Sequence, residues 1–154
     1  MEATDLSRQP GPDDGRETEL LNYIYSLLNF DELRNSPTNL LAAISMYSTE
    51  CKRLIHIGPR KGAQIADKIA ERKPYVMFEL GGYVGYSAIL FGDAVRRAGG
   101  QRYISLEINP IHAAVAKLLI ELAGLEDFIS IIIAPAHLSL AQLVHDNLLD
   151  AAFT

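Results

Sequence analysis

The stretch Glu79-Leu80-Gly81-Gly82-Tyr83-Val84-Gly85-Tyr86-Ser87 decides the fold expected of this chain. It follows an apolar run at 75–78 and precedes a helix-like segment at 87–98. A strand, a glycine-rich turn and a helix in this order present backbone N–H groups and a helix N-terminus to a nucleotide-like ligand. The spacing G-G-x-x-G is neither the G-x-G-x-x-G of dinucleotide binders nor a P-loop. It predicts a ligand without a pyrophosphate, and the alternative is a tight turn that binds nothing.

The segments around this turn alternate between strand and helix. Strands are predicted at 75–80, 103–107 and 128–133, and helices at 61–73, 87–98, 110–123 and 139–149. The strand cores are apolar and β-branched, which is typical of a parallel sheet buried on both faces. The sequence therefore predicts an α/β protein, with about three parallel strands and helices on both faces.

Two further helices are predicted ahead of the first strand. The first begins at Arg16 and places Leu20, Leu21, Ile24, Leu27 and Leu28 on one face. The second has Ser36 as its N-cap and Pro37 at its first position, and its apolar face carries Leu40, Leu41, Ile44, Tyr47 and Cys51. Residues 1–15 are polar and rich in turn formers, so they are predicted to be a disordered tail. Residues 16–154 are expected to form one domain.

Composition narrows the class of protein. The net charge of −5 and the pI near 5.3 argue against nucleic acid as a partner, which needs clustered cations. Cys51 has no second cysteine to pair with, which fits a reducing compartment. The sequence has neither a secretory signal nor an apolar run of the roughly 20 residues that a membrane span requires. A cytoplasmic protein that does not bind a membrane is therefore predicted.

Glu107 narrows the choice of possible ligands. It ends the strand after the glycine turn, where an acid can accept the hydroxyls of a ribose. Glu79 and Glu107, beside a turn that lacks a phosphate motif, favour a nucleoside that carries a cation. S-adenosylmethionine has a ribose diol, a sulfonium and an amino group and no phosphate, so it is the predicted cofactor. The alternative is that Glu107 only caps the helix that opens at Pro110.

The run from about residue 19 to 143 resembles the catechol O-methyltransferase family, especially its fungal catechol O-methyltransferase-like members. The residues that carry the resemblance are Ile57-Gly58, Lys61-Gly62, the block 79–87, Leu106-Glu107-Ile108-Asn109-Pro110 and Leu122-Ala123-Gly124. It implies the Rossmann-like class I methyltransferase fold and transfer of the sulfonium methyl to a hydroxyl of a catechol-like phenol. The match covers nearly all of this chain but only the first two-thirds of the family's domain.

The resemblance also implies which residues hold the cofactor. Ile57 matches a position whose backbone holds the methionine part, and Ser87 lies near its carboxylate end. Glu107 matches the ribose-binding acid, and Ile108 the position that flanks the adenine. The other matched positions are Glu79, Gly81 and Tyr83 in the turn and Ala136 and His137 around the adenine.

The chain departs from the family's pattern at several of these places. Ala136 and His137 stand where the family usually has Ser and Gln. His56 replaces a usual Asn beside the cofactor, and Pro59-Arg60 replaces an acidic pair. These changes predict weaker or altered cofactor binding rather than none.

In the family, Mg²⁺ binds both catechol oxygens and a lysine acts as the base. The metal ligands are an Asp ending the fourth strand and an Asp-Asn pair ending the fifth, whereas this sequence stops where the fourth strand is expected to begin. The resemblance therefore implies a truncated chain that binds cofactor without turnover. The strand at 75–80 is expected to keep an unpaired edge suited to self-association or pairing.

Two other functions stay open at this point. One is a non-catalytic S-adenosylmethionine-binding protein that partners a full-length paralogue, and the other is a nicotinamide-dependent oxidoreductase, which the missing G-x-G-x-x-G disfavours. Asp146 and Asp150, four residues apart on one predicted helix, are a weak metal candidate. His112 and His145 are expected at the surface.

Overall fold

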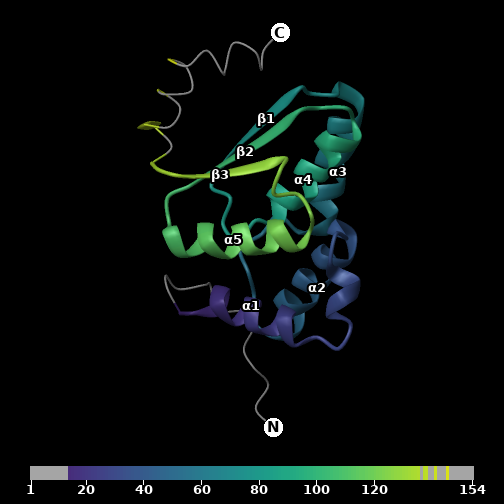
Figure 1. Cartoon of the computed structure of the whole chain (residues 1–154), viewed down its shortest axis with the longest axis vertical. Helices are drawn as coiled ribbons and strands as arrows, with labels where there is room; N and C mark the ends of the chain where they lie inside the picture. Colours follow the sequence, from purple (N-terminus) through teal and green to yellow (C-terminus); the bar gives the residue numbers. More distant parts are fainter. Residues whose placement is uncertain (1–13, 136, 139–140, 142–144, 146–154) are drawn as a thin grey trace.

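A computed structural model describes residues 14–135, 137, 138, 141 and 145 (Figure 1). In chain order the elements are α1 (Arg16–Ser26), the 3₁₀ helix η1 (Phe30–Leu33), α2 (Pro37–Glu50), α3 (Gly58–Arg72), β1 (Val76–Leu80), α4 (Tyr86–Arg97), β2 (Arg102–Glu107), α5 (Pro110–Leu122) and β3 (Ile129–Ile133). The three strands form one parallel sheet in the order β1-β2-β3. The predicted α/β class and all three predicted strands are confirmed.

The strand register sets the geometry of the site. Glu79 on β1 lies opposite Ser105 on β2, and Ser105 lies opposite Ile131 on β3. Because the strands are parallel, their carboxyl ends meet at one edge of the sheet, where the glycine turn leaves β1. Among the described strands β1 pairs only with β2, so it is an edge strand of the sheet. The association expected of this strand edge stays a prediction.

Helices are layered beside the sheet. Helix α4 contacts all three strands and α5 contacts β2 and β3, while α1, α2 and α3 form an outer layer against these two helices (Figure 1). A second apolar cluster consists only of strand residues, namely Val76, Phe78, Ile104, Leu106 and Ile132. The helix expected at 139–149 lies almost entirely outside the described residues, so the predicted helical cover on both faces is not tested.

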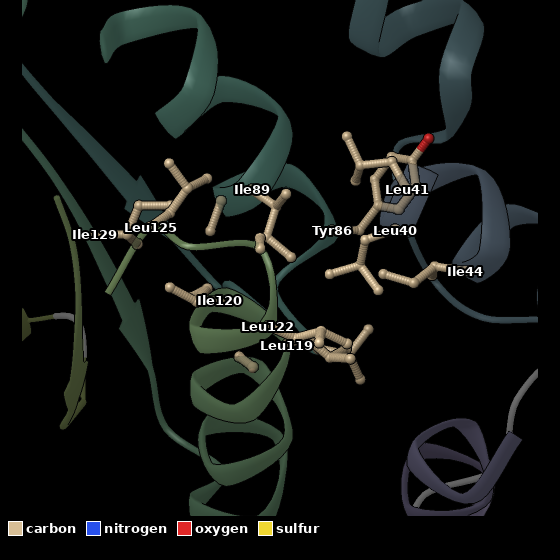
Figure 2. Close-up of a cluster of buried hydrophobic side chains, with 14 of the residues drawn as sticks. Leu40, Leu41, Ile44, Tyr86, Ile89, Leu119, Ile120, Leu122, Leu125 and Ile129 are labelled. Carbon is tan, nitrogen blue, oxygen red and sulfur yellow. The ribbon is translucent and has the colours of Figure 1, made fainter. Parts of the chain in front are cut away.

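The main core lies between the sheet and the helices (Figure 2). Leucine and isoleucine side chains of α2, α4 and α5 meet there, and Leu40, Ile44, Ile89 and Leu119 are fully buried. Burying a side chain of this size contributes about 1.5–3 kcal/mol relative to leaving it exposed. This packing fixes α4, which follows the glycine turn in the chain, and α5, which lies against the turn at Gly85.

The two N-terminal helices form as predicted, with two exceptions on their apolar faces. Leu20 and Ile24 are buried, but α1 ends at Ser26, so Leu28 lies beyond the helix and is exposed. Cys51 was predicted on the apolar face of α2, yet it is the C-cap residue and is exposed. Both predictions were wrong because the helical period was extended past the point where the helix ends.

Two predicted boundaries also shift. The tail was predicted to reach residue 15, but Asp14 forms an ion pair with Arg16 and Gly15 is the N-cap of α1. The tail prediction is therefore wrong for these two residues, and residues 1–13 lie outside the described chain. Helix α3 begins at Gly58 rather than residue 61, because Pro59 is tolerated in a first helical turn.

The N-cap of α2 is confirmed, and it leads to a stability prediction. The Ser36 hydroxyl accepts the N–H of Asn39 at 3.4 Å, and Pro37 occupies the first helical position. We expect Ser36→Ala to lower the free energy of unfolding by about 0.5–1 kcal/mol, since the bond is long. Chemical denaturation measures this, and Ser36→Asp, which keeps a cap acceptor, is the control. A loss of equal size in both variants would contradict the capping role.

Gly85 allows the turn to pack against α5. It is the N-cap of α4 with φ of +88°, a conformation that favours glycine. A side-chain carbon at this position would lie 3.1 Å from the Cβ of Ala116 and 3.2 Å from its Cα. Glycine is therefore required both by the backbone conformation and by the close approach of α5.

Candidate functional site

A cavity of about 220 Å³ opens at the carboxyl end of β1, beside the glycine turn. Five residues predicted for cofactor binding line it together: Ile57, Glu79, Gly81, Tyr83 and Ser87. A side-chain carbon added at Gly81 would meet no atom within 4 Å, so the backbone of the turn faces open space there. The structure brings these five residues together, and their assignment to a cofactor stays a prediction.

Five further residues complete the lining: Ile55, His56, Gly82, Tyr86 and Phe91. The His56 ring stacks on Tyr86 with centroids 4.3 Å apart, and its Nδ1 accepts the N–H of Gly58 at 3.0 Å. Burial lowers the pKa of His56, which favours the neutral ring that this acceptor role requires. His56 and Tyr86 are therefore part of the cavity wall. The family resemblance had placed His56 beside the cofactor, whereas Tyr86 was not predicted as a site residue.

Glu79 is the acidic residue that lines this cavity. Its carboxylate accepts hydrogen bonds from the hydroxyls of Ser87 and Ser105, the latter at 2.7 Å. Burial raises the pKa of Glu79, and the two serine hydrogen bonds oppose that shift. The fully buried Tyr103 hydroxyl is near enough to affect this pKa but makes no hydrogen bond of ordinary geometry. Ser105 was not predicted as a site residue, although it lies two residues before Glu107 on the same side of β2.

The raised pKa of Glu79 predicts a pH-dependent stability. A carboxyl whose pKa is raised by folding stabilises the fold below its ordinary pKa of 4.5, and this contribution is lost as the pH rises through the raised value. We therefore expect Glu79→Gln to raise the melting temperature at pH 7, because the amide places no charge in this partly buried position. The gain should vanish near pH 4, where Glu79 is protonated in the wild type. Thermal melts at both pH values measure this, and a lower melting temperature of the variant at pH 7 would contradict it.

Glu107 ends β2 beside the turn and is buried, with 6% of its surface exposed. One carboxylate oxygen accepts the backbone N–H of Tyr83 and the other that of Asn109, each at 2.8 Å. The N-cap of α5 is Asn109, whose Oδ1 accepts the N–H groups of Ile111 and His112. The alternative that Glu107 itself caps this helix is therefore wrong. Each oxygen of Glu107 keeps a further lone pair for a ligand.

The other predicted residues surround the cavity less closely. Ile108 follows Glu107 and is 66% exposed, so its side chain offers a free apolar surface beyond the strand end. His137 is exposed, and neither residue lines the cavity. Ala136, Asp146 and Asp150 lie outside the described residues.

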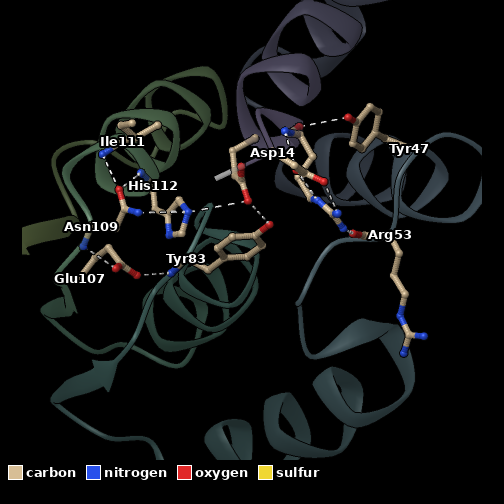
Figure 3. A network of polar contacts seen from close by, with 10 residues as sticks. Asp14, Tyr47, Arg53, Tyr83, Glu107, Asn109, Ile111 and His112 are labelled. Atoms are coloured by element: carbon tan, nitrogen blue, oxygen red, sulfur yellow. Dashed lines mark hydrogen bonds and ion pairs between the residues drawn. The ribbon is translucent and has the colours of Figure 1, made fainter. Parts of the chain in front are cut away.

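Tyr83 connects the turn to α1 and α5 (Figure 3). It has φ of +50°, which is uncommon for a residue with a side chain. Its hydroxyl donates to Glu17 Oε1 at 2.6 Å, and its ring packs edge-on against His112. Burial and this hydrogen bond raise the pKa of Tyr83 far above 10.0, so the hydroxyl stays protonated. Glu17 was missed, because nothing in the sequence links residue 17 to a turn 66 positions later.

His112 was predicted at the surface, and this is wrong. Its side chain is only 20% exposed, and Nε2 lies 3.7 Å from Glu17 Oε1. The sequence places it in the first turn of α5, but the packing of α1 against α5 covers that turn.

A larger, more open groove of about 610 Å³ runs along α2 and is bounded by α3 and α4. It is lined mainly by apolar atoms, and Tyr86 forms a wall of both the groove and the smaller cavity. The smaller cavity is the better candidate site, because it contains the half-buried Glu79 carboxylate and the backbone of the turn. Among the described residues there is no group of three or more His, Cys, Asp or Glu that could hold a metal ion. No helix in that part of the chain is long and apolar enough to cross a membrane.

Fold and site together define an α/β protein with a small, acid-lined cavity at the carboxyl ends of parallel strands. Residues 53–154 match the family model described as O-methyltransferase, and this chain therefore belongs to the O-methyltransferase family. The catechol O-methyltransferase of Bos taurus is 40% identical over 92 residues, which are 59% of this chain and 33% of that protein. The match thus spans about a third of the length of that relative.

Solved structures agree on the fold. The cofactor-bound protein Rv0187 from MTB superposes with a TM-score of 0.57 at 25% identity, covering 88% of this chain and 57% of that one. An O-methyltransferase from Bacillus cereus in complex with SAH gives a TM-score of 0.57 at 22% identity, covering 87% of this chain and 50% of that one. The predicted Rossmann-like methyltransferase fold is confirmed.

Proposed function

We propose that this chain binds S-adenosylmethionine at the glycine turn, as part of an O-methyltransferase that acts on a catechol-like phenol. The observation that carries this is the placement of two carboxylates, Glu79 and Glu107, at neighbouring strand ends around a turn that faces open space. The cofactor supplies an electrophilic methyl group on a cationic sulfonium, and a negatively charged site favours such a cation. The cofactor-bound relatives and the bovine catechol O-methyltransferase support the assignment.

The backbone of the turn disfavours a phosphate ligand. The N–H of Gly81 donates to the Leu106 carbonyl at 2.8 Å, and that of Gly85 to the Gly82 carbonyl at 2.9 Å. The N–H of Tyr83 is taken by Glu107. Phosphate-binding turns need such N–H groups free to point at the anion, so the arrangement supports S-adenosylmethionine over a nicotinamide dinucleotide.

Different parts of the cofactor are assigned to different described residues. A volume of about 220 Å³ is below the roughly 300 Å³ of a typical ligand pocket, so the cavity accommodates one part of the cofactor. We assign the methionine part to the cavity, near Ile57 and Ser87, and the ribose hydroxyls to the remaining lone pairs of Glu107. Ile108 then offers its exposed side chain to the adenine. The family resemblance implies Mg²⁺, but no described group fits that ion, and no step is assigned to it.

Calorimetric titration of the folded chain tests the proposal. We expect saturable binding of S-adenosylhomocysteine and no binding of NAD⁺ under the same conditions. A folded chain that fails to bind S-adenosylhomocysteine, or that binds NAD⁺ tightly, would overturn it. A methylation assay with S-adenosylmethionine, Mg²⁺ and a catechol then separates the two remaining alternatives: turnover supports an enzyme, and binding without turnover supports a non-catalytic partner of a longer paralogue.

A further inference from the structure

His112 lies where three segments meet: the start of α1, the glycine turn and the start of α5 (Figure 3). Its ring packs against the Tyr83 ring with centroids 4.9 Å apart at 88°. Its Nε2 lies 3.7 Å from Glu17 Oε1 and 3.4 Å from Asn109 Nδ2. Glu17 Oε1 is the same oxygen that accepts the Tyr83 hydroxyl. One imidazole nitrogen therefore faces both an amide donor and the acceptor that holds Tyr83.

The capping role of Asn109 fixes which tautomer the neutral ring adopts. Asn109 Oδ1 accepts the N–H groups of Ile111 at 2.9 Å and His112 at 3.3 Å. Only the oxygen of the amide can accept these bonds, so its NH₂ group must be the one that faces the imidazole. Neutral His112 can accept from that group only through a lone pair on Nε2, which places the ring proton on Nδ1.

Protonation reverses the role of Nε2. The imidazolium carries N–H on both nitrogens, so Nε2 and Asn109 Nδ2 become two donors facing one another. The favourable partner is then Glu17 Oε1. A charge-assisted hydrogen bond of this kind is about 2.7–2.9 Å long, shorter than the observed 3.7 Å. Forming it draws Glu17 Oε1 toward the ring, and the Tyr83 hydroxyl then shares that oxygen with a stronger donor.

The charged groups around this junction come from two further elements. From α1, Glu17 faces the ring, while the guanidinium of Arg16 is held by Asp14 and by the Arg53 carbonyl. From the end of β2, Glu107 accepts the N–H groups of Tyr83 and Asn109. Of these groups, Glu17 is thus the carboxylate that lies within ion-pair distance of His112 Nε2.

We propose that His112 is a positioning residue for the cofactor turn. Neutral His112 bonds to Asn109 and leaves Glu17 to hold the Tyr83 hydroxyl, whereas protonated His112 takes Glu17 and loosens Tyr83. Tyr83 donates its backbone N–H to Glu107 and lines the cavity, so this change reaches the site. The effect on cofactor affinity rests on the proposed function, but the exchange of Glu17 between the Tyr83 hydroxyl and His112 does not.

Nuclear magnetic resonance tests the exchange without any cofactor. Long-range ¹⁵N spectra at pH 8 should show neutral His112 protonated on Nδ1, and Asn109→Ser, which keeps a cap oxygen but removes the NH₂ group, should release the ring toward the Nε2–H form. The Tyr83 ¹³Cζ shift should follow the titration of His112 in the wild type and not in His112→Gln. An Nε2–H tautomer in the wild type, or a Tyr83 shift that ignores the titration, would overturn the proposal.

Calorimetry with S-adenosylhomocysteine tests the consequence for binding. Between pH 8 and pH 5.5 the wild type should lose about three- to tenfold in affinity, the effect of weakening one hydrogen bond. His112→Gln should lose less than twofold over the same range. If both proteins lose affinity equally, His112 does not position the turn. If neither the wild type nor His112→Gln binds S-adenosylhomocysteine at any pH, the proposed function fails. The NMR spectra still test whether Glu17 exchanges between Tyr83 and His112.

Discussion

Replacing Glu107 by alanine is expected to weaken S-adenosylhomocysteine binding at least about 100-fold. In the proposed complex the carboxylate accepts two ribose hydroxyls, and a hydrogen bond to a charged group contributes about 1.5–3 kcal/mol. The substitution also leaves the backbone N–H groups of Tyr83 and Asn109 without their acceptor, which removes the support of the turn itself. Titration calorimetry measures the affinity, and circular dichroism establishes that the variant is folded.

Two control variants separate the ligand from the scaffold. Glu126→Ala removes an exposed acid in the loop before β3, so it should leave the affinity unchanged. Glu107→Gln keeps one acceptor oxygen, and we expect an intermediate loss because the amide cannot accept at both positions. Wild-type affinity in a folded Glu107→Ala protein would show that this residue does not bind the cofactor.

Gly82→Ala should produce the second large effect, on stability and on binding together. The new methyl group would overlap the Ser105 hydroxyl and would lie 3.4 Å from Glu79 Oε2. Relieving the overlap forces Ser105 to turn away from Glu79, which leaves this half-buried carboxylate with one hydrogen bond fewer. Overpacking of this kind costs about 1–3 kcal/mol of unfolding free energy. Chemical denaturation measures this cost, and the same preparation is titrated with S-adenosylhomocysteine.

A second substitution tests whether the overlap with Ser105 is the cause. Ser105→Ala removes the hydroxyl, and its remaining Cβ would lie 3.4 Å from the new methyl group, an ordinary contact. We therefore expect the double variant to be more stable than the sum of the two single variants by about 1 kcal/mol. Simple additivity would show that Gly82 is required for another reason.

The fold was predictable from local signals, and its boundaries were less so. The strands at 76–80, 102–107 and 129–133 are short runs with apolar residues, and each lies between a glycine or proline on either side, so their existence followed directly from the sequence. Leu28 and Cys51 were placed wrongly because periodicity continues in the sequence after the helix has ended in space. Where a helix stops depends on tertiary packing, which a single sequence does not contain.

The candidate site was predictable as far as it is local to the turn. Glu79, Gly81, Tyr83 and Ser87 are close in sequence, and they line one cavity. The residues that support the site come from distant parts of the chain: Glu17 contacts Tyr83 from α1, and Ser105 contacts Glu79 from the neighbouring strand β2. Ser105 shares a side of its strand with Glu107, so the period of two gave a signal for it. Glu17 and His112 meet only because α1 packs on α5.

Cys51 gives this chain its own attachment point for a spectroscopic probe. It is the one cysteine in the sequence and is exposed at the end of α2, next to Thr49 and Glu50, which line the open groove. A thiol-reactive fluorophore placed there requires no substitution anywhere in the protein. Because Tyr86 separates that groove from the cavity at the turn, a ligand that displaces its ring changes the surroundings of the dye. We therefore expect a ligand in the cavity to change the fluorescence of this dye, with no substitution in the sequence.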